Sequence, residues 1–172
     1  VHSQVHSSVQ TGKASTSSAV VPPNILVRPP HHKDILELSV TMRQEDKNEI
    51  WHLARVTPME ALQRAMESCR YNRAVLLDGK VVCIFGVGGE KGGLGVPWML
   101  ASDLLKKIRK PFLKECSRYL EEMSEGYSQL FNVAWTKNTE HIRWLKWMGF
   151  NFGTPEPMGP DGEYFISFSK VI

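Results

Sequence analysis

The clearest structural signal in this chain is the run Asn138-Thr-Glu-His-Ile-Arg-Trp-Leu-Lys-Trp-Met-Gly149-Phe150. Asparagine is a favoured residue at the start of a helix, and glycine supplies the left-handed residue that commonly follows its end. Between them, Ile142 and Leu145 lie at helical spacing on one apolar face. The run therefore predicts a three-turn helix that begins at Thr139, is capped by Asn138 and stops at Gly149.

The segments on either side of this helix alternate between strand and helix patterns. Residues 129–135 form an apolar strand, and before it Pro111 opens a long helix that Gly126 closes. After the helix, Tyr164–Phe168 reads as the last strand. The carboxyl-terminal half thus predicts helix, strand, helix, strand.

The amino-terminal half adds four strands and two or three helices. Its strands are expected at 25–27, 74–77, 80–85 and about 96–101, and its helices over 33–54 and after Thr57-Pro58. Asp78-Gly79 is a strong two-residue hairpin turn. The sequence therefore predicts a mixed α/β fold, with a central sheet flanked by helices.

Glycine occupies six of the ten positions from Gly86 to Gly95. Such a stretch suits a phosphate-binding loop, but GxxxxGK[ST] is absent and no helix pattern follows directly. We expect a flexible connection between strands here.

The first 23 residues differ in composition from the rest. They hold six serines, one formal charge at Lys13 and no aromatic residue. Such a segment buries too little apolar surface to offset roughly 1–2 kcal/mol of backbone entropy per ordered residue. We expect an extended or disordered amino-terminal arm at 1–23 and one folded domain at 24–172.

Composition narrows the class of protein further. The chain has 172 residues, 42% of them hydrophobic, and a net charge of +3, which is less basic than most nucleic-acid modules. Three widely spaced cysteines, Cys69, Cys83 and Cys116, form no ligand motif, and we expect buried reduced thiols. No apolar run approaches the roughly 20 residues of a membrane span, and no secretory signal is recognised. We expect synthesis in a host cytoplasm.

The order of elements and the 138–150 run resemble the GNAT family of acyltransferases, which bind acetyl-coenzyme A where two central strands splay apart. GNAT proteins typically show Asn, a Tyr seven positions later, and Gly-Phe at plus eleven and twelve. Asn138, Gly149 and Phe150 fall in that register, whereas the tyrosine position is Leu145. The resemblance implies a GNAT-like sheet.

More narrowly, the body from about His31 to Ile172 resembles a family of small tailed-bacteriophage proteins that includes the internal virion protein of T7-like podoviruses. The shared pattern includes Asp78-Gly79, Phe85-Gly86, Gly95-Val96-Pro97-Trp98 and 138–150. This resemblance implies a protein of the phage particle, located in the virion, that helps assembly or is ejected with the genome.

The GNAT resemblance also implies a Q/R-x-x-G-x-G/A turn whose bare N–H groups bind the coenzyme pyrophosphate. Aligned on Leu113, its glycine positions fall at Ile108 and Lys110, and β-branched Ile108 crowds the main chain. We expect a solvated basic turn, or a vestigial site in which side chains replace the glycines. The candidate cofactor-binding residues are Lys106, Arg109, Lys110 and Asn138.

The general acid of the family is also missing, because leucine at 145 donates no proton. Losing a positioned acid costs about 10²–10⁴ in rate. Substitute acids are Tyr127 or Tyr119, and candidate bases are Asp103, Glu90 or Glu163. We expect no catalytic residue, no metal and no cofactor, with acetyl-coenzyme A required only if the fold is still an enzyme.

Two further clusters have competing interpretations. His31-His32 with Asp34 suits helix capping better than ligation of a metal. His141, Arg143, Lys146 and Lys137 beside Trp135, Trp144 and Trp147 suggest either stacking on single-stranded nucleic acid or core tryptophans with solvated charges.

The preferred hypothesis is a virion-associated structural protein on a degenerate GNAT-like fold, which contacts other phage proteins through its arm and exposed aromatics. Trp147 and Trp98 are the expected exposed anchors. The alternatives are an active N-acyltransferase and a nucleic-acid-associated factor.

Overall fold

The computed structural model describes residues 23–89 and 92–172. The predicted arm at 1–23, apart from Pro23, and the candidate base Glu90 lie outside these ranges.

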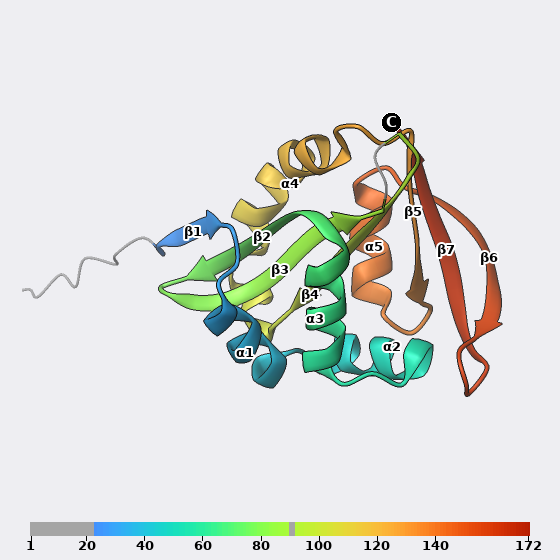
Figure 1. The fold of residues 1–172 in the computed structure, drawn as a ribbon, viewed down its shortest axis with the longest axis horizontal. Coiled ribbons are helices and arrows are strands. Elements are labelled where there is room, and N and C mark those ends of the chain that lie inside the picture. Colours follow the sequence, from blue (N-terminus) through green and yellow to red (C-terminus); the bar gives the residue numbers. More distant parts are fainter. Residues whose placement is uncertain (1–22, 90–91) are drawn as a thin grey trace, which may run out of the picture.

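The described chain forms one seven-stranded sheet with helices on both faces (Figure 1). The strands are β1 (Ile25–Arg28), β2 (Cys69–Leu77), β3 (Lys80–Gly88), β4 (Leu94–Ala101), β5 (Gln129–Trp135), β6 (Asn151–Met158) and β7 (Glu163–Val171). The helices are α1 (His32–Thr41), α2 (Gln44–Ala54), α3 (Pro58–Ser68), the 3₁₀ helix η1 (Asp103–Lys107), α4 (Arg109–Ser124) and α5 (Thr139–Trp147).

The spatial order of the strands is β1-β2-β3-β4-β5-β7-β6. Every neighbouring pair is antiparallel except β4 and β5, which run parallel in the middle of the sheet. The predicted mixed α/β architecture is confirmed.

Each face of the sheet has its own apolar core because side chains alternate along a strand. On β2, Val75 joins the cluster that α4 and α5 cover, while Ala74 joins the cluster under α1 and α3. Leu38 and Leu62, on α1 and α3, are completely buried in that second cluster.

The predicted turn at Asp78-Gly79 and the predicted cap at Thr57 are confirmed. Asp78 and Gly79 both have positive φ, as a type I′ hairpin turn requires. Thr57 caps α3, with its hydroxyl accepting from the Glu60 N–H at 3.3 Å and its own N–H donating to the Glu60 carboxylate at 2.8 Å.

Five of the ten positions from Gly86 to Gly95 lie in strands, so the connection between strands is shorter than the sequence predicted. Gly86 and Gly88 belong to β3 and Gly95 belongs to β4. A Cβ on Gly95 would lie 2.7 Å from Leu130 Cδ2 and 2.9 Å from the Tyr127 ring, so only glycine lets β4 approach β5.

Strand β6 was not predicted, because Pro155 and Pro157 interrupt its pattern. It lies at the edge of the sheet, where a residue without an N–H is tolerated on the unpaired side. Its ladder with β7 shifts register between Phe152 and Pro155.

Candidate functional site

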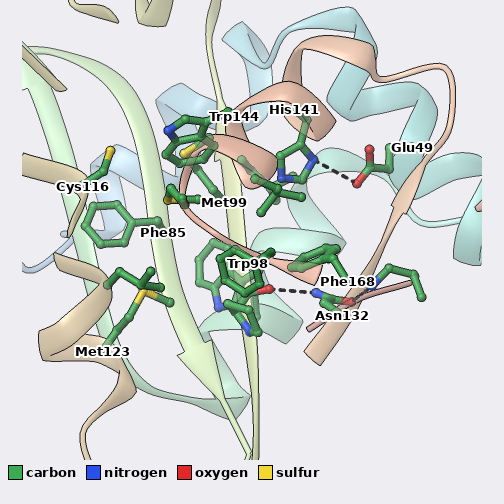
Figure 2. Close-up of a pocket in the computed structure, with 18 of the residues that line it drawn as sticks. Glu49, Phe85, Trp98, Met99, Cys116, Met123, Asn132, His141, Trp144 and Phe168 are labelled. Carbon is green, nitrogen blue, oxygen red and sulfur yellow. Dashed lines mark hydrogen bonds and ion pairs between the residues drawn. The ribbon is translucent and has the colours of Figure 1, made fainter. Parts of the chain in front are cut away.

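A gap opens in the centre of the sheet because β4 and β5 pair over only two positions. Leu94 pairs with Gln129 and Gly95 with Leu130, after which the strands diverge. A chamber of about 230 Å³ lies in this gap, which we call the inner chamber (Figure 2).

The main-chain edge of β4 that faces the gap is largely occupied. Pro97 has no N–H, and its carbonyl accepts a 2.8 Å hydrogen bond from the Asn132 side chain on β5. The N–H and C=O of one strand residue point to the same side, so Pro97 removes a donor that would have faced β5. Figure 2 shows Asn132 reaching toward β4 below Trp98.

Farther along the same edge, helix α2 occupies the main chain of Ala101. The Ala101 N–H donates to Asp46 Oδ2 at 2.9 Å, and its carbonyl accepts from the Arg43 N–H at 2.9 Å. The main-chain groups of β4 that face β5 belong to alternate residues, which are Gly95, Pro97, Met99 and Ala101. Of these, Gly95 pairs with β5. Three of these four positions are therefore closed to a ligand.

The walls of the inner chamber are predominantly hydrocarbon and aromatic. The principal apolar side chains are Phe85, Trp98, Met99, Trp144, Leu145 and Phe168. Trp98 is half-buried and packs against the cluster under α1 and α3, so its predicted role as an exposed anchor is wrong. Trp147 is exposed as predicted, at 56%, and its role as an anchor for a partner stays a prediction.

Leu145 lies where the GNAT pattern has its tyrosine, and it is 4% exposed within the main core. Of the substitute acids, Tyr119 lines the chamber, whereas the Tyr127 hydroxyl donates to the Gly89 carbonyl at 3.3 Å. The candidate base Asp103 is paired with Lys106 at 3.2 Å, and Glu163 with Lys137 at 2.9 Å. Neither carboxylate lines the chamber.

A carboxylate–imidazole pair that no local spacing predicted also lines the chamber. Glu49 on α2 lies 3.8 Å from His141 Nδ1 on α5, and the two side chains face each other in Figure 2. Burial raises the pKa of Glu49, but the nearby His141 imidazole and the hydrogen bonds from the Asn138 amide and the Trp135 main chain outweigh it, so this pKa is lowered. Glu49 therefore stays ionised in an apolar setting.

Asn138 does not cap α5 with its side chain, which corrects that prediction. Its amide donates to Glu49 at 2.8 Å and to Asp46 at 3.3 Å, and the residue is 1% exposed. The side chain thus ties the start of α5 to α2. The hydrogen-bond partners of Asn138 are distant in sequence, which is why local spacing predicted a helix cap at this residue.

Asn138 belongs to a buried charge cluster whose centre is an ion pair. Arg43 and Asp46 are joined at 2.7 Å, with side chains that are each 4% exposed. The pKa of Asp46 is raised, because burial outweighs the opposing hydrogen bond and charge of Arg43. The Arg43 guanidinium also lies 3.5 Å from Glu140. This cluster holds α2, β4 and α5 together beneath the gap.

A second cavity of about 180 Å³, the outer crevice, lies between α5 and the segment formed by η1 and the start of α4. Lys106 and Arg109 line it, whereas Lys110 is exposed outside it and Asn138 lies in the charge cluster. The structure therefore brings together two of the four candidate cofactor-binding residues. Their role in binding a cofactor stays a prediction.

The glycine positions implied by the GNAT pattern are filled by side chains. Ile108 precedes α4 at the N-cap, is 1% exposed and contributes to the main core. The Phe112 and Trp144 rings then join α4 to α5, with centroids 5.7 Å apart, and both line the outer crevice and the inner chamber. The residues present do not match the main-chain donor set that the resemblance implies for coenzyme A.

The cluster at 31–34 and the cysteines have structural roles. The carboxylate of Asp34 accepts from the His31 N–H at 2.6 Å and pairs with Arg28, as the capping interpretation predicted. All three cysteines are free; Cys83 and Cys116 are buried as predicted, and Cys69 is half-buried.

Two general features can be stated for residues 23–89 and 92–172. No helix there is long and apolar enough to span a bilayer. No group of three or more His, Cys, Asp or Glu residues in those ranges is arranged to hold a metal ion.

Comparison with solved structures defines the class: the chain has the GNAT acyltransferase fold. It matches a ribosomal-protein-alanine N-acetyltransferase from Brucella melitensis with a TM-score of 0.64 and 14% identity, over 86% of this chain and 99% of that one. A putative acetyltransferase from Salmonella typhimurium, solved with its cofactor acetyl-CoA, matches with a TM-score of 0.63 and 13% identity, over 86% and 94% of the two chains. The ribosomal-protein-S18-alanine N-acetyltransferase from Escherichia coli gives 0.61 and 15%, over 87% and 94%.

The sequence is similar to a phage protein. Residues 73–155 match the family described as "Bacteriophage T7, probable scaffold protein Gp13". The chain is 37% identical over 71 residues to the probable scaffold protein gp13 of Escherichia phage T7, which is 39% of this chain and 50% of that relative. The match thus spans about half the length of the curated relative. The resemblance to both groups, GNAT proteins and the T7 phage family, is confirmed.

Proposed function

We propose that this chain is a structural or assembly protein of a bacteriophage particle, built on a GNAT-like fold that does not transfer acyl groups. Similarity to a probable scaffold protein supports the phage context. The closed edge of β4, with Pro97, Ala101 and their partners, is the observation that carries the loss of catalysis. In this proposal the chain is an internal component of the virion and needs no cofactor.

The absence of the family's acid supports the same proposal. Leu145 is packed in the core, and Ile108 is packed where a pyrophosphate turn needs bare main chain. Restoring either function would require more than one substitution, because each side chain also fills a core position.

The first test measures cofactor binding to the full chain by thermal unfolding with acetyl-coenzyme A. A ligand at a hundredfold excess over its Kd stabilises the folded state by about 2.7 kcal/mol. We expect no change in Tm at millimolar acetyl-coenzyme A. A concentration-dependent rise in Tm would contradict the non-catalytic part of the proposal.

The second test addresses assembly. In the proposal the arm at 1–23 docks on other particle proteins by extended main-chain hydrogen bonds. A chain lacking residues 1–22 should keep the Tm of the body but lose incorporation into particles, measured on purified virions. Incorporation at the level of the full chain would refute docking through the arm.

An active N-acyltransferase is the second candidate, and the Glu49–His141 pair in the inner chamber favours it. Such a pair is suited to accept a proton from an amine. Acetyl transfer to any amine, lost in Glu49→Gln but kept in the exposed control Glu115→Gln, would establish this candidate and exclude the structural proposal.

A further inference from the structure

The outer crevice has a positive lining. Arg43, Lys106, Arg109 and Arg143 line it together with His141, and Glu140 is the only carboxylate of the lining. Asp46 and Asp103 pair with Arg43 and Lys106, so four basic groups face three carboxylates and the crevice keeps an excess of one positive charge. An occupant of this crevice is therefore expected to carry negative charge.

Two of these cations have no partner within the described part of the chain. Arg43 is neutralised by Asp46 and Glu140, and Lys106 is paired with Asp103. Arg109 and Arg143 make no ion pair or side-chain hydrogen bond with residues 23–89 or 92–172. They belong to opposite walls, since Arg109 begins α4 and Arg143 lies on α5.

The floor between these walls is apolar. Leu105, Leu113, Phe112 and Trp144 form it, and the exposed ring of Trp147 stands at its edge. An apolar cavity of roughly 150 Å³ holds one benzene ring, so a crevice of about 180 Å³ suits one large apolar side chain. Exposed tryptophan beside arginine is the usual composition of a binding hot spot.

The combination favours a peptide over a polyphosphate. A phosphate chain would bring its charge against a floor of leucine and aromatic rings, where a charged group that loses its water is costly. A peptide with carboxylates beside an apolar residue matches both the basic walls and the apolar floor of the crevice. Guanidinium groups at the walls bind carboxylates in a bidentate manner, and the apolar side chain packs on the floor.

We propose that the outer crevice is a docking site for an acidic segment of a partner protein, with one large apolar residue between carboxylates. The proposal rests on the proposed function, since an assembly protein must contact other particle proteins. It goes further by assigning the surface, its two anchoring arginines and the chemistry of the partner.

The test uses fluorescence polarisation on the full chain with a labelled synthetic peptide, Glu-Asp-Glu-Phe-Glu-Asp-Glu, and its Gln/Asn counterpart. We expect the acidic peptide to bind and the neutral one to bind at least tenfold more weakly. Arg109→Gln and Arg143→Gln should each weaken binding about tenfold, and Trp147→Ala should weaken it similarly. Lys146→Gln is the matched control, because Lys146 lies on α5 but faces the Phe152 ring, and it should bind like the unaltered chain.

Several results would overturn the proposal. These are no binding at millimolar peptide, equal binding of the neutral peptide, and an equal loss in Lys146→Gln. Displacement of the peptide by coenzyme A or by a twelve-nucleotide oligo(dT) at lower concentration would assign the crevice to phosphate ligands instead.

Particle incorporation separates this proposal from the proposed function. If Arg109→Gln/Arg143→Gln loses peptide binding but enters particles normally, the docking site is refuted and the assembly role stands. If the unaltered chain binds peptide but is absent from particles, the assembly role fails while the site stands.

Discussion

Asp46→Ala tests the buried charge cluster that closes the far edge of β4. Asp46 accepts hydrogen bonds from the Arg43 guanidinium, the Ala101 N–H and the Asn138 amide. Removing the carboxylate leaves a buried cation and a buried main-chain donor without that partner. Breaking such a pair from one side costs about 3–5 kcal/mol.

The value for this chain should fall near the lower limit, because Glu140 stays 3.5 Å from Arg43 and can take over part of its charge. We therefore expect a loss of about 3 kcal/mol in the free energy of unfolding and a Tm lower by about 10 °C. Urea unfolding at pH 7, followed by circular dichroism, measures the difference.

Two companion variants make the result specific. Asp103→Ala removes a carboxylate from the exposed pair with Lys106, and it should change the free energy of unfolding by less than about 1 kcal/mol. Arg43→Met/Asp46→Leu replaces the buried pair by apolar groups and should recover part of the loss, but not all, since Ala101 keeps no acceptor. A cost below about 1 kcal/mol for Asp46→Ala would refute the idea that this cluster holds α2 against the gap.

Three other substitutions probe the fold and the site. Gly95→Ala places a methyl group against Leu130 at the point where β4 meets β5, and it should cost about 1–3 kcal/mol in urea unfolding; an unchanged midpoint would contradict the close approach. Leu145→Ala should cost about 2–5 kcal/mol by the same measurement, and a cost near zero would show that Leu145 is not a core residue. Burial raises the pKa of Asp34, but the hydrogen bonds from Arg28 and from the His31 N–H, together with the Arg28 charge, outweigh burial, so this pKa is lowered in the folded state. Ionised Asp34 therefore stabilises the fold at pH values above the pKa of the unfolded state. This stabilisation is lost as the pH falls through the pKa of the folded state. Asp34→Asn should flatten the fall in stability between about pH 5 and pH 2, measured by urea unfolding at each pH, and an unchanged slope would exclude Asp34 as a cause.

Most of the fold was predictable because its elements carry local signals. Residues 129–135 form β5 as expected, and Thr57-Pro58 and Asp78-Gly79 mark a cap and a turn whose chemistry depends on neighbours in sequence. Strand β6 was missed because Pro155 is allowed only by its position at a sheet edge, which is a property of the assembled sheet.

The site was less predictable because its groups meet across long distances in sequence. Leu145 and Ile108 could be recognised as replacements because the GNAT resemblance places the family's tyrosine and one of its glycines at these positions, and both lie in the core. Glu49 and His141, by contrast, lie on different helices, and only the packing of α2 against α5 brings them together. Asn138 illustrates the same limit, because its partners are distant carboxylates instead of the neighbouring main chain.

The sheet topology explains why the main-chain groups of β4 that face β5 need partners within the chain. Parallel strands that diverge leave main-chain groups of β4 facing a gap, and unpaired buried groups are costly. An acyltransferase can satisfy such groups with its bound coenzyme. In this chain, Pro97 removes one donor, Asn132 satisfies the adjoining carbonyl, and Asp46 and Arg43 satisfy Ala101. Three of the four main-chain positions of β4 that face β5 are thus satisfied within the chain, as the proposed role of the sheet as a building block requires.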